Sequence, residues 1–338
     1  MFRETLNPLG STDFMMFVRR DLVAGAWAAP QAAAPAADEE AYTRQLKALA
    51  STVTLGGTKG NAQGQFADPK GVAVALDGSV FVIDSFNSRI QKFDKDGKFL
   101  LGFGSEGAGD GQLKEPWSAV IGNNGDLYVA DTWNHRVQRF DAQGVFKQKW
   151  GTQQLVGNAT EAPGNFFGPR GIAVDPQGNL LVTDAGNHRV QKFDPDGKLI
   201  SVFGGRGAGD GLLSEPVGIA VDKQGNFYVA DTWNRRIQKF DPAGKYQAQW
   251  PIAGWEGESV ANKPYLAVDG EGAIYVTDPE MHRVIKLSPS GQVQAVWGKN
   301  GRDASSFNLP TGIGVASTGD IWVVDSLNQR VQKFAPVR

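Results

Sequence analysis

The sequence has no cysteine, only three histidines and no long apolar run, and each absence excludes a class of protein. Without cysteine there are no disulfides, no thiol nucleophile and no cysteine-ligated zinc module such as a RING domain. No apolar stretch approaches the roughly 20 residues of a membrane-spanning helix, and the N-terminus does not resemble a signal peptide. The net charge of −2 provides no basic field, which argues against nucleic acid as a partner.

A repeat organises most of the chain. Glycine is abundant, at 43 residues, and follows no collagen period, which indicates many tight turns between short strands. The pattern Asp-x-x-Asn-x-Arg recurs at spacings of 47, 53, 47, 47 and 47 residues, and a proline opens each unit. The aspartates are Asp84, Asp131, Asp184, Asp231, Asp278 and Asp325, and the prolines are Pro69, Pro116, Pro169, Pro216, Pro264 and Pro310.

Each unit reads as four short strands. In the third unit the apolar segments are Gly171–Val174, Leu180–Thr183, Arg189–Phe193 and Lys198–Phe203. Turns of the Asp-Pro-x-Gly type separate the first from the second and the third from the fourth. Four antiparallel strands in a repeat of this length form one propeller blade, so six units predict an all-β, six-bladed β-propeller.

The last unit lacks its fourth strand, because only Ala335–Arg338 follow the third. The segment Thr52–Gly57, before the first complete unit, has the fourth-strand pattern. We therefore expect this N-terminal strand to complete the last blade, which closes the ring and removes open sheet edges.

These repeats resemble the NHL repeat of bacterial NHL repeat-containing proteins, most closely in Gly171–Asp175 and Asp184–Lys198. The resemblance covers residues 51–338 and implies the propeller fold without implying an activity. Blade 5 departs from the pattern with Met281 in place of Asn and Leu266 in place of Gly, and blade 2 has Ser118 at that glycine position. Such repeats often follow membrane-embedded segments in larger bacterial proteins, so we expect an extracytoplasmic propeller, part of a larger membrane-anchored protein.

Residues 1–50 are expected to form a separate N-terminal segment, with the propeller domain at 51–338. Ala28–Ala37 is an Ala/Pro-rich linker, and Asp38–Ala50 suits a short capped helix. Thr12–Leu22 has the composition of the end of another folded domain.

The repeated charged residues and the histidines favour structural roles. An Asp and an Arg that recur in every blade cannot mark one active site, so we expect the Asp to cap loops and the Arg to pack between blades. His135, His188 and His282 occupy one repeat position in blades 2, 3 and 5, which spreads them around a ring. We therefore predict no metal and no other cofactor.

Six-bladed enzymes are the competing class. Amidating lyases of this architecture hold zinc with histidines just after the opening proline, and lactonase-like propellers hold calcium with channel carboxylates and amides. The residues after the six opening prolines are Lys70, Trp117, Arg170, Val217, Tyr265 and Thr311. None of them is a histidine or a carboxylate, so no catalytic residues are predicted, and a lyase or hydrolase remains the alternative.

Aromatic residues on the loop face are the candidate binding site. The loop after each second strand and the connection after each fourth strand emerge on one face of a propeller. Exposed aromatics on a rigid scaffold commonly bind ligands, although they also pack on neighbouring blades. The candidate site residues are Phe86, Trp117, Trp133, Arg170, His188, Trp233 and Tyr265.

We expect the site to centre on blade 3. Trp133 and Trp233 flank Gly186 in the repeat, which predicts a shallow cleft with indole walls and Arg170 and His188 in its floor. The insertion at Gln153–Pro163 could overhang it. The sequence thus predicts a non-catalytic scaffold that binds a protein, peptide or glycan.

Overall fold

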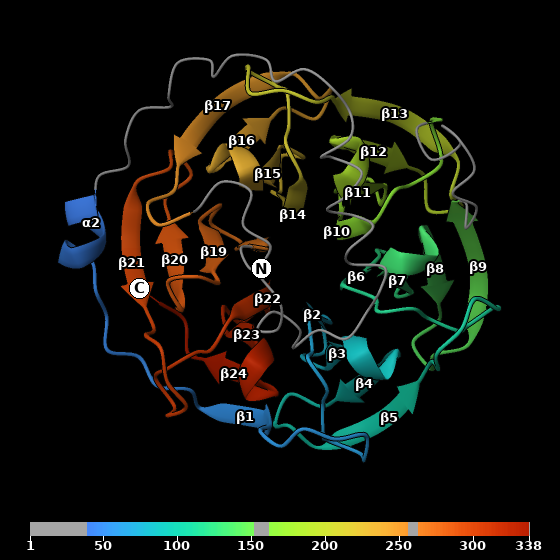
Figure 1. The fold of residues 1–338 in the computed structure, drawn as a ribbon, viewed down its shortest axis with the longest axis horizontal. Helices are drawn as coiled ribbons and strands as arrows, with labels where there is room; N and C mark the ends of the chain where they lie inside the picture. Colours follow the sequence, from blue (N-terminus) through green and yellow to red (C-terminus); the bar gives the residue numbers. More distant parts are fainter. Residues whose placement is uncertain (1–38, 152–161, 256–262, 338) are drawn as a thin grey trace, which may run out of the picture. The chain divides into compact units, whose positions relative to one another are not determined.

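The computed structural model describes residues 39–151, 162–255 and 263–337, and these residues form a ring of six four-stranded antiparallel sheets. The predicted six-bladed β-propeller is therefore confirmed (Figure 1). Among the described residues, no helix is long and apolar enough to cross a bilayer. The linker and most of the insertion lie outside the described residues, and these assignments, like the domain boundary expected at residue 50, stay predictions.

In blades 1 to 5 the strands follow one another outward from the channel in chain order. Blade 1 contains β2 (Gly71–Val74), β3 (Val80–Asp84), β4 (Arg89–Phe93) and β5 (Phe99–Phe103). Blade 2 contains β6 (Ser118–Ile121), β7 (Leu127–Asp131), β8 (Arg136–Phe140) and β9 (Phe146–Gly151). Blade 3 contains β10 (Pro169–Val174), β11 (Leu180–Asp184), β12 (Arg189–Phe193) and β13 (Leu199–Gly204), close to the predicted segments.

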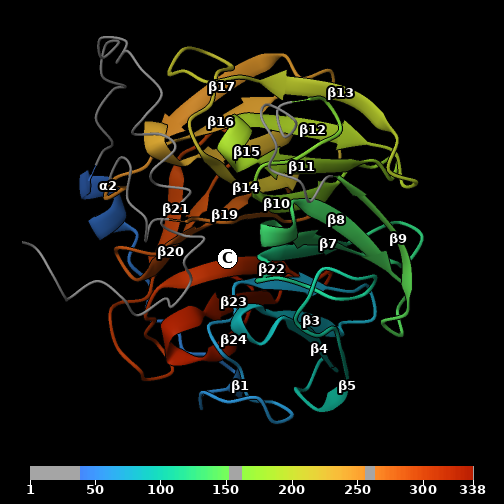
Figure 2. The ribbon, with the colours of Figure 1, turned by 45° about the vertical axis from the view of Figure 1, so that its right-hand side comes forward.

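The other three blades include the closure. Blade 4 contains β14 (Pro216–Val221), β15 (Phe227–Asp231), β16 (Arg236–Phe240) and β17 (Tyr246–Pro251). Blade 5 contains β18 (Leu266–Val268), β19 (Ile274–Asp278), β20 (Arg283–Leu287) and β21 (Val293–Trp297). Blade 6 contains β22 (Pro310–Val315), β23 (Ile321–Asp325) and β24 (Arg330–Phe334), and β1 (Val53–Gly56) is its outer strand, as predicted (Figure 2).

A short 3-10 turn follows the second strand in five blades. These turns are η1 (Ser85–Asn87), η2 (Thr132–Asn134), η3 (Ala185–Asn187), η4 (Thr232–Asn234) and η5 (Ser326–Asn328). The residue after each turn has a left-handed backbone, with φ between 49° and 58°. Asn and His tolerate this conformation better than β-branched residues do, which agrees with the histidines at this position.

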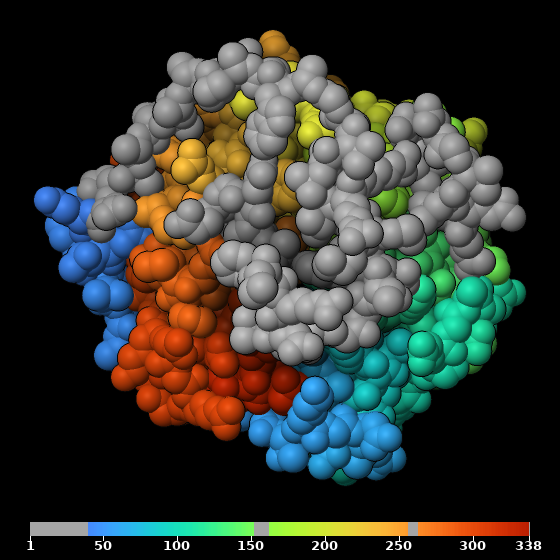
Figure 3. Space-filling view, in the orientation of Figure 1, coloured from blue at the N-terminus to red at the C-terminus, as the bar shows by residue number. Residues whose placement is uncertain are grey.

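The segment before β1 differs from its prediction. The helix α2 spans only Glu39–Arg44, and the chain then extends along the outer edge of blade 5, where Leu46 pairs in parallel with Val296 of β21. Tyr42 is buried there, and the Arg283 guanidinium lies 4.7 Å from its ring centre. Figure 3 shows these blue residues on the rim beside the orange blade. Backbone pairing with β21 therefore replaces the second half of the expected helix.

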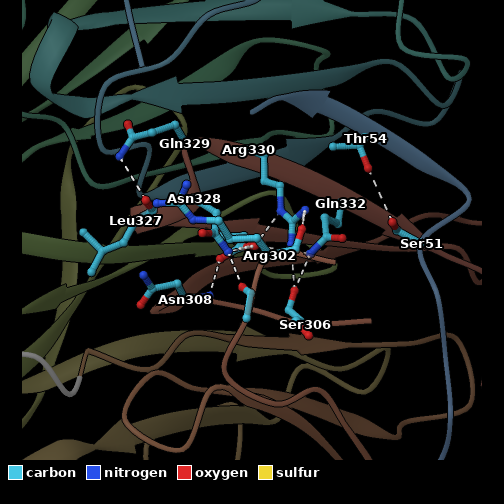
Figure 4. A network of polar contacts seen from close by, with 12 residues as sticks. Ser51, Thr54, Arg302, Ser306, Asn308, Leu327, Asn328, Gln329, Arg330 and Gln332 are labelled. Carbon is cyan, nitrogen blue, oxygen red and sulfur yellow. Dashed lines mark hydrogen bonds and ion pairs between the residues drawn. The ribbon is translucent and has the colours of Figure 1, made fainter. Parts of the chain in front are cut away.

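The repeated Asp and Arg residues form buried ion pairs that tie each blade to the connection before it. In blade 2, Asp131 accepts hydrogen bonds from the backbone N–H of Lys114 (2.7 Å) and from Arg136 Nε (2.7 Å). The rest of the Arg136 guanidinium donates to carbonyls of the glycine-rich connection. Figure 4 shows the same network in blade 6, where Arg330 and Gln332 both donate to the carbonyl of Ser306. The expected structural role of these residues is confirmed.

Candidate functional site

The six innermost strands line a central channel of about 310 Å³. Its wall is made of backbone and of aliphatic side chains such as Val72, Ile172 and Ile313, together with Ser118 and Tyr265. In the described part of the chain, no three His, Asp or Glu side chains are grouped so that they could hold a metal ion. The channel wall thus offers backbone polar groups and apolar surface.

The residues after the opening prolines form a ring at one end of the channel. The glycine after Arg170 shows how closely neighbouring blades approach here: a Cβ added to Gly171 would lie 2.3 Å from the carbonyl oxygen of Val217. Within this ring the Arg170 guanidinium stacks 3.9 Å from the centre of the Trp117 ring, and Lys70 Nζ lies 5.7 Å from the same centre. Blades 1, 2 and 3 therefore contribute one cation–aromatic cluster.

Glu215 extends this cluster toward blade 5. Its carboxylate lies 2.7 Å from Lys263 Nζ and 3.5 Å from Arg170, and all three side chains are buried. Burial lowers the pKa of Lys263 and of Arg170, while the Glu215 carboxylate opposes both shifts. Burial also raises the pKa of Tyr265, and Arg170 acts in the opposite direction. We name Lys70, Trp117, Arg170, Glu215, Trp233, Lys263 and Tyr265 the mouth cluster.

The two loop tryptophans differ in their surroundings. Trp233 is half-buried, and Lys263 Nζ lies 5.8 Å from its ring centre, so it joins the mouth cluster. Trp133 is buried and lies beside Glu115. Burial raises the pKa of the Glu115 carboxyl, with Trp133 and Lys70 opposing the shift. Phe86, in blade 1, is 37% exposed, more than either tryptophan.

The cleft expected over Gly186 is filled. A Cβ on Gly186 would lie 2.2 Å from Cδ1 of Phe167, because the phenylalanine ring from the preceding connection lies over the glycine. Phe167 also stacks on His135, with 5.6 Å between the ring centres. Arg170 is buried in the mouth cluster, and His188 is buried beside Glu215. The structure thus brings Arg170 and Trp117 together instead of opening a groove between two indoles.

Sequence reasoning missed Glu215 and Lys263. Both occupy the position just before the opening proline, where the six blades have Asp68, Glu115, Gly168, Glu215, Lys263 and Leu309. Four of these residues besides the glycine have a left-handed backbone, so the position is geometrically special. A comparison of the blades at this position would have found the lysine of blade 5 among acidic counterparts.

The histidines are part of the scaffold. Nδ1 of His135, His188 and His282 accepts the backbone N–H of the residue before the next blade's opening proline, at 3.0, 3.1 and 3.3 Å. In blade 6, Oε1 of Gln329 accepts the N–H of Asp68 in the same way, at 2.7 Å. Each of these side chains therefore links one blade to the next. For the histidines, this link requires that Nδ1 carries no proton.

His282→Gln is expected to reduce the acid sensitivity of the ring. Glutamine makes this bond in blade 6, so the link between blades should be kept. Burial lowers the pKa of His282, so the folded state favours the neutral ring. The stability from this group is complete above the unfolded-state pKa of about 6.5 and is lost as the pH falls through the lower folded value.

The measurement is the free energy of unfolding of wild type and variant between about pH 8 and about pH 5. We expect similar values at the upper end and a variant that is more stable at the lower end, by about the 1 kcal/mol of one hydrogen bond. A difference that does not change with pH would contradict a titrating His282.

Comparisons with known proteins agree with this architecture. The family model described as "NHL repeat" matches residues 113–140, 166–193, 213–240 and 307–334. The chain is 32% identical over 150 residues to "Protein brain tumor" of Drosophila melanogaster. These aligned residues make up 44% of this chain and 13% of that protein. It is also 42% identical over 59 residues to "RING finger protein nhl-1" of Caenorhabditis elegans, and these residues make up 18% of this chain and 6% of that protein. The chain thus spans a small part of these relatives.

Solved structures share the fold at low sequence identity. An inactive virginiamycin B lyase from Staphylococcus aureus, solved with quinupristin, has a TM-score of 0.56 and 15% identity over 83% of this chain and 99% of the lyase. A gluconolactonase from Xanthomonas campestris has a TM-score of 0.59 and 15% identity over 90% of this chain and 98% of that chain. At such identity the likeness concerns the fold alone. The chain thus contains NHL repeats within the fold of a six-bladed β-propeller.

Proposed function

We propose that this chain is a non-catalytic binding scaffold whose loop face, around the mouth cluster, recognises a protein, peptide or glycan. The observation that carries the proposal is a contrast between repeat positions. The Asp and Arg that hold the blades together are the same in all six blades, whereas the residue after the opening proline differs in every blade. Variation at a position that faces the channel mouth is typical of a surface that serves recognition on a constant scaffold.

The chemistry of the mouth cluster suits recognition. Indoles such as Trp117 and Trp233 can stack on a sugar ring or pack on an apolar side chain. Arg170 and Lys263 already share the Glu215 carboxylate, so an acidic group of a ligand could take up part of that pairing. The ring of residues after the prolines contains neither histidine nor carboxylate, which favours binding over the metal-dependent chemistry of six-bladed enzymes.

Trp233→Ala and Trp117→Ala are expected to weaken ligand binding. Truncation of an aromatic residue that dominates a binding surface weakens the binding free energy by about 2 kcal/mol or more. This corresponds to a roughly 30-fold weaker affinity. The assay is binding to glycan arrays and peptide libraries, followed by affinity measurement of the variants on each ligand found.

Leu327→Ala is the matched control for Trp233→Ala. Leu327 holds the same repeat position in blade 6, is exposed, and lies outside the mouth cluster. Its truncation should leave affinity unchanged, and all variants should melt near the wild-type temperature. If the two Trp variants bind normally while Leu327→Ala does not, the site is on the other side of the ring. If the Trp variants unfold, their role is packing.

A further inference from the structure

In four of the six joints between blades, a side chain of one blade's turn accepts the backbone N–H of the residue before the next opening proline. Three of these joints use Nδ1 of a histidine, in the pairs His135 with Gly168, His188 with Glu215 and His282 with Leu309. The joint from blade 6 to blade 1 uses the side-chain amide of Gln329, which accepts the N–H of Asp68. An imidazole nitrogen that takes up a proton becomes a donor and can no longer accept, whereas an amide oxygen does not titrate. The three histidine joints are therefore sensitive to pH, and the glutamine joint is not.

One of the three histidine joints holds a charged residue. Gly168 has no side chain, and Leu309 is aliphatic. Glu215, in contrast, supplies the carboxylate of the mouth cluster, with Oε1 at 2.7 Å from Lys263 Nζ and at 3.5 Å from Arg170 Nη2. His188 is thus one hydrogen bond away from the ion pairs of the candidate site.

The backbone of Glu215 needs this hydrogen bond. Its φ of 47° lies in the left-handed region, which costs conformational energy for a residue other than glycine and persists where its surroundings hold it. His188 Nδ1 accepts the N–H of Glu215 at 3.1 Å, and Asp231 Oδ1 accepts the N–H of the preceding Ser214 at 2.7 Å. Loss of the histidine as an acceptor would let Glu215 relax and move its carboxylate.

Several charged groups surround the joint at His188. They are Arg170, Glu215 and Lys263 of the mouth cluster, the ion pair of Asp184 and Arg189 in blade 3, and Asp231 of blade 4. In the equivalent joint between blades 5 and 6, burial lowers the pKa of His282 and the Asp325 carboxylate opposes this shift. Asp231 is the repeat counterpart of Asp325, so it favours the imidazolium form of His188. The cations of the mouth cluster act in the opposite direction.

We propose that His188 positions Glu215 in the mouth cluster, and that protonation of His188 releases this carboxylate from Arg170 and Lys263. The proton binds Nδ1, so the N–H of Glu215 then meets a second N–H and the bond between them is lost. The carboxylate can turn toward the imidazolium, which leaves the two cations to an acidic group of a ligand. The inference rests on the proposed binding function and adds that the site favours acidic ligands as the pH falls.

His188→Gln tests the positioning role, and His282→Gln is its matched control. Gln329 makes the same bond in blade 6 with a φ of 58°, so both variants should fold. The backbone amide resonances of Glu215, Leu309 and Asp68 are followed by NMR from about pH 8 to the lowest pH at which the ring stays folded. In the wild type, the amides of Glu215 and Leu309 should titrate and that of Asp68 should not. His188→Gln should abolish the transition at Glu215 alone, and His282→Gln the transition at Leu309 alone.

The side chain of Glu215 provides the decisive resonance. Its carboxyl carbon should shift in the same transition as its amide in the wild type, and should stay fixed in His188→Gln. A Glu215 amide that does not titrate, or that titrates equally in His188→Gln, would overturn the proposal. A carboxyl carbon that stays fixed while the amide titrates would also overturn it, because the bond would then break without releasing the carboxylate.

Two sugars test the consequence for binding. D-Glucuronate combines a sugar ring with a carboxylate that stays ionised above about pH 5, and D-glucose is its neutral match. The wild type should bind glucuronate at least about fivefold more tightly at about pH 5.5 than at about pH 7.5. His188→Gln should remove this dependence, and glucose should show none in either protein.

The binding experiment also separates this inference from the proposed function. A glucuronate affinity that rises equally in the wild type and in His188→Gln would overturn the control by His188. If neither sugar binds at either pH, the proposed function loses support, while the two resonances of Glu215 still decide whether His188 controls the carboxylate.

Discussion

Deletion of residues 1–60 is expected to unfold or aggregate the ring, whereas deletion of residues 1–38 leaves it closed. The longer deletion removes β1, which pairs with β24 from Val53↔Lys333 to Gly56↔Arg330. Burial of Leu55 contributes about 2 kcal/mol and each ladder hydrogen bond about 1 kcal/mol, so the loss exceeds about 4 kcal/mol. It also opens the outer edge of β24 to other chains. Thermal melting and light scattering of both truncations measure the effect.

A point substitution makes the same test without a deletion. Leu55 is buried with Phe66 and Val331, whereas its neighbour Thr54 is exposed. Leu55→Asp should therefore destabilise the ring strongly, and Thr54→Asp should not. Equal melting temperatures for the two variants, or for the two truncations, would show that β1 does not close the ring.

Asp131→Ala is expected to destabilise the protein by about 3–5 kcal/mol, because it leaves the buried Arg136 without its carboxylate. The same substitution removes the acceptor for Asn134 and Gln138. Urea unfolding measures the change in free energy. The exposed Asp196, replaced by Ala, should show little change.

Blade 5 provides a comparison within the repeat. Asp278 also pairs with its arginine, but Met281 and Ile285 stand where the other blades have Asn and Gln donors. Burial raises the pKa of Asp278 to about 6. Asp278→Ala should therefore lower the free energy of unfolding less than Asp131→Ala does. The reverse order would contradict the role assigned to the amide donors.

The repeat period made the fold predictable, because a 47-residue unit with turns at constant offsets allows little besides a blade. Thr52–Gly57 could be recognised as the missing strand from its pattern alone, and the structure differs by one residue at each end. Local side-chain packing was harder to predict from the sequence. Nothing in the sequence of blade 3 indicates that Phe167 folds back over Gly186, since repeat position specifies a backbone site and not a side-chain direction.

The candidate site could be predicted in part. The sequence singled out Trp117, Arg170 and Tyr265, but it gave no reason for Glu215 to bridge two cations across blades. Such contacts join residues from three repeats, whereas comparison of repeats aligns residues that lie a blade apart. The pairing of Leu46 with Val296 could not be predicted for a similar reason. Helix propensity depends on local sequence, whereas the edge of β21 is distant in sequence.

The sixth blade combines strands that are far apart in the sequence, so it is completed late during translation. Val53 leaves the ribosome about 280 residues before its partner Lys333. At roughly 5–20 residues per second, β1 waits on the order of 15 to 55 s for β24. During that interval blades 1 to 5 can form from contiguous sequence, but the circle stays open. The nascent chain is thus most exposed to chaperones and to wrong partners just before β24 emerges.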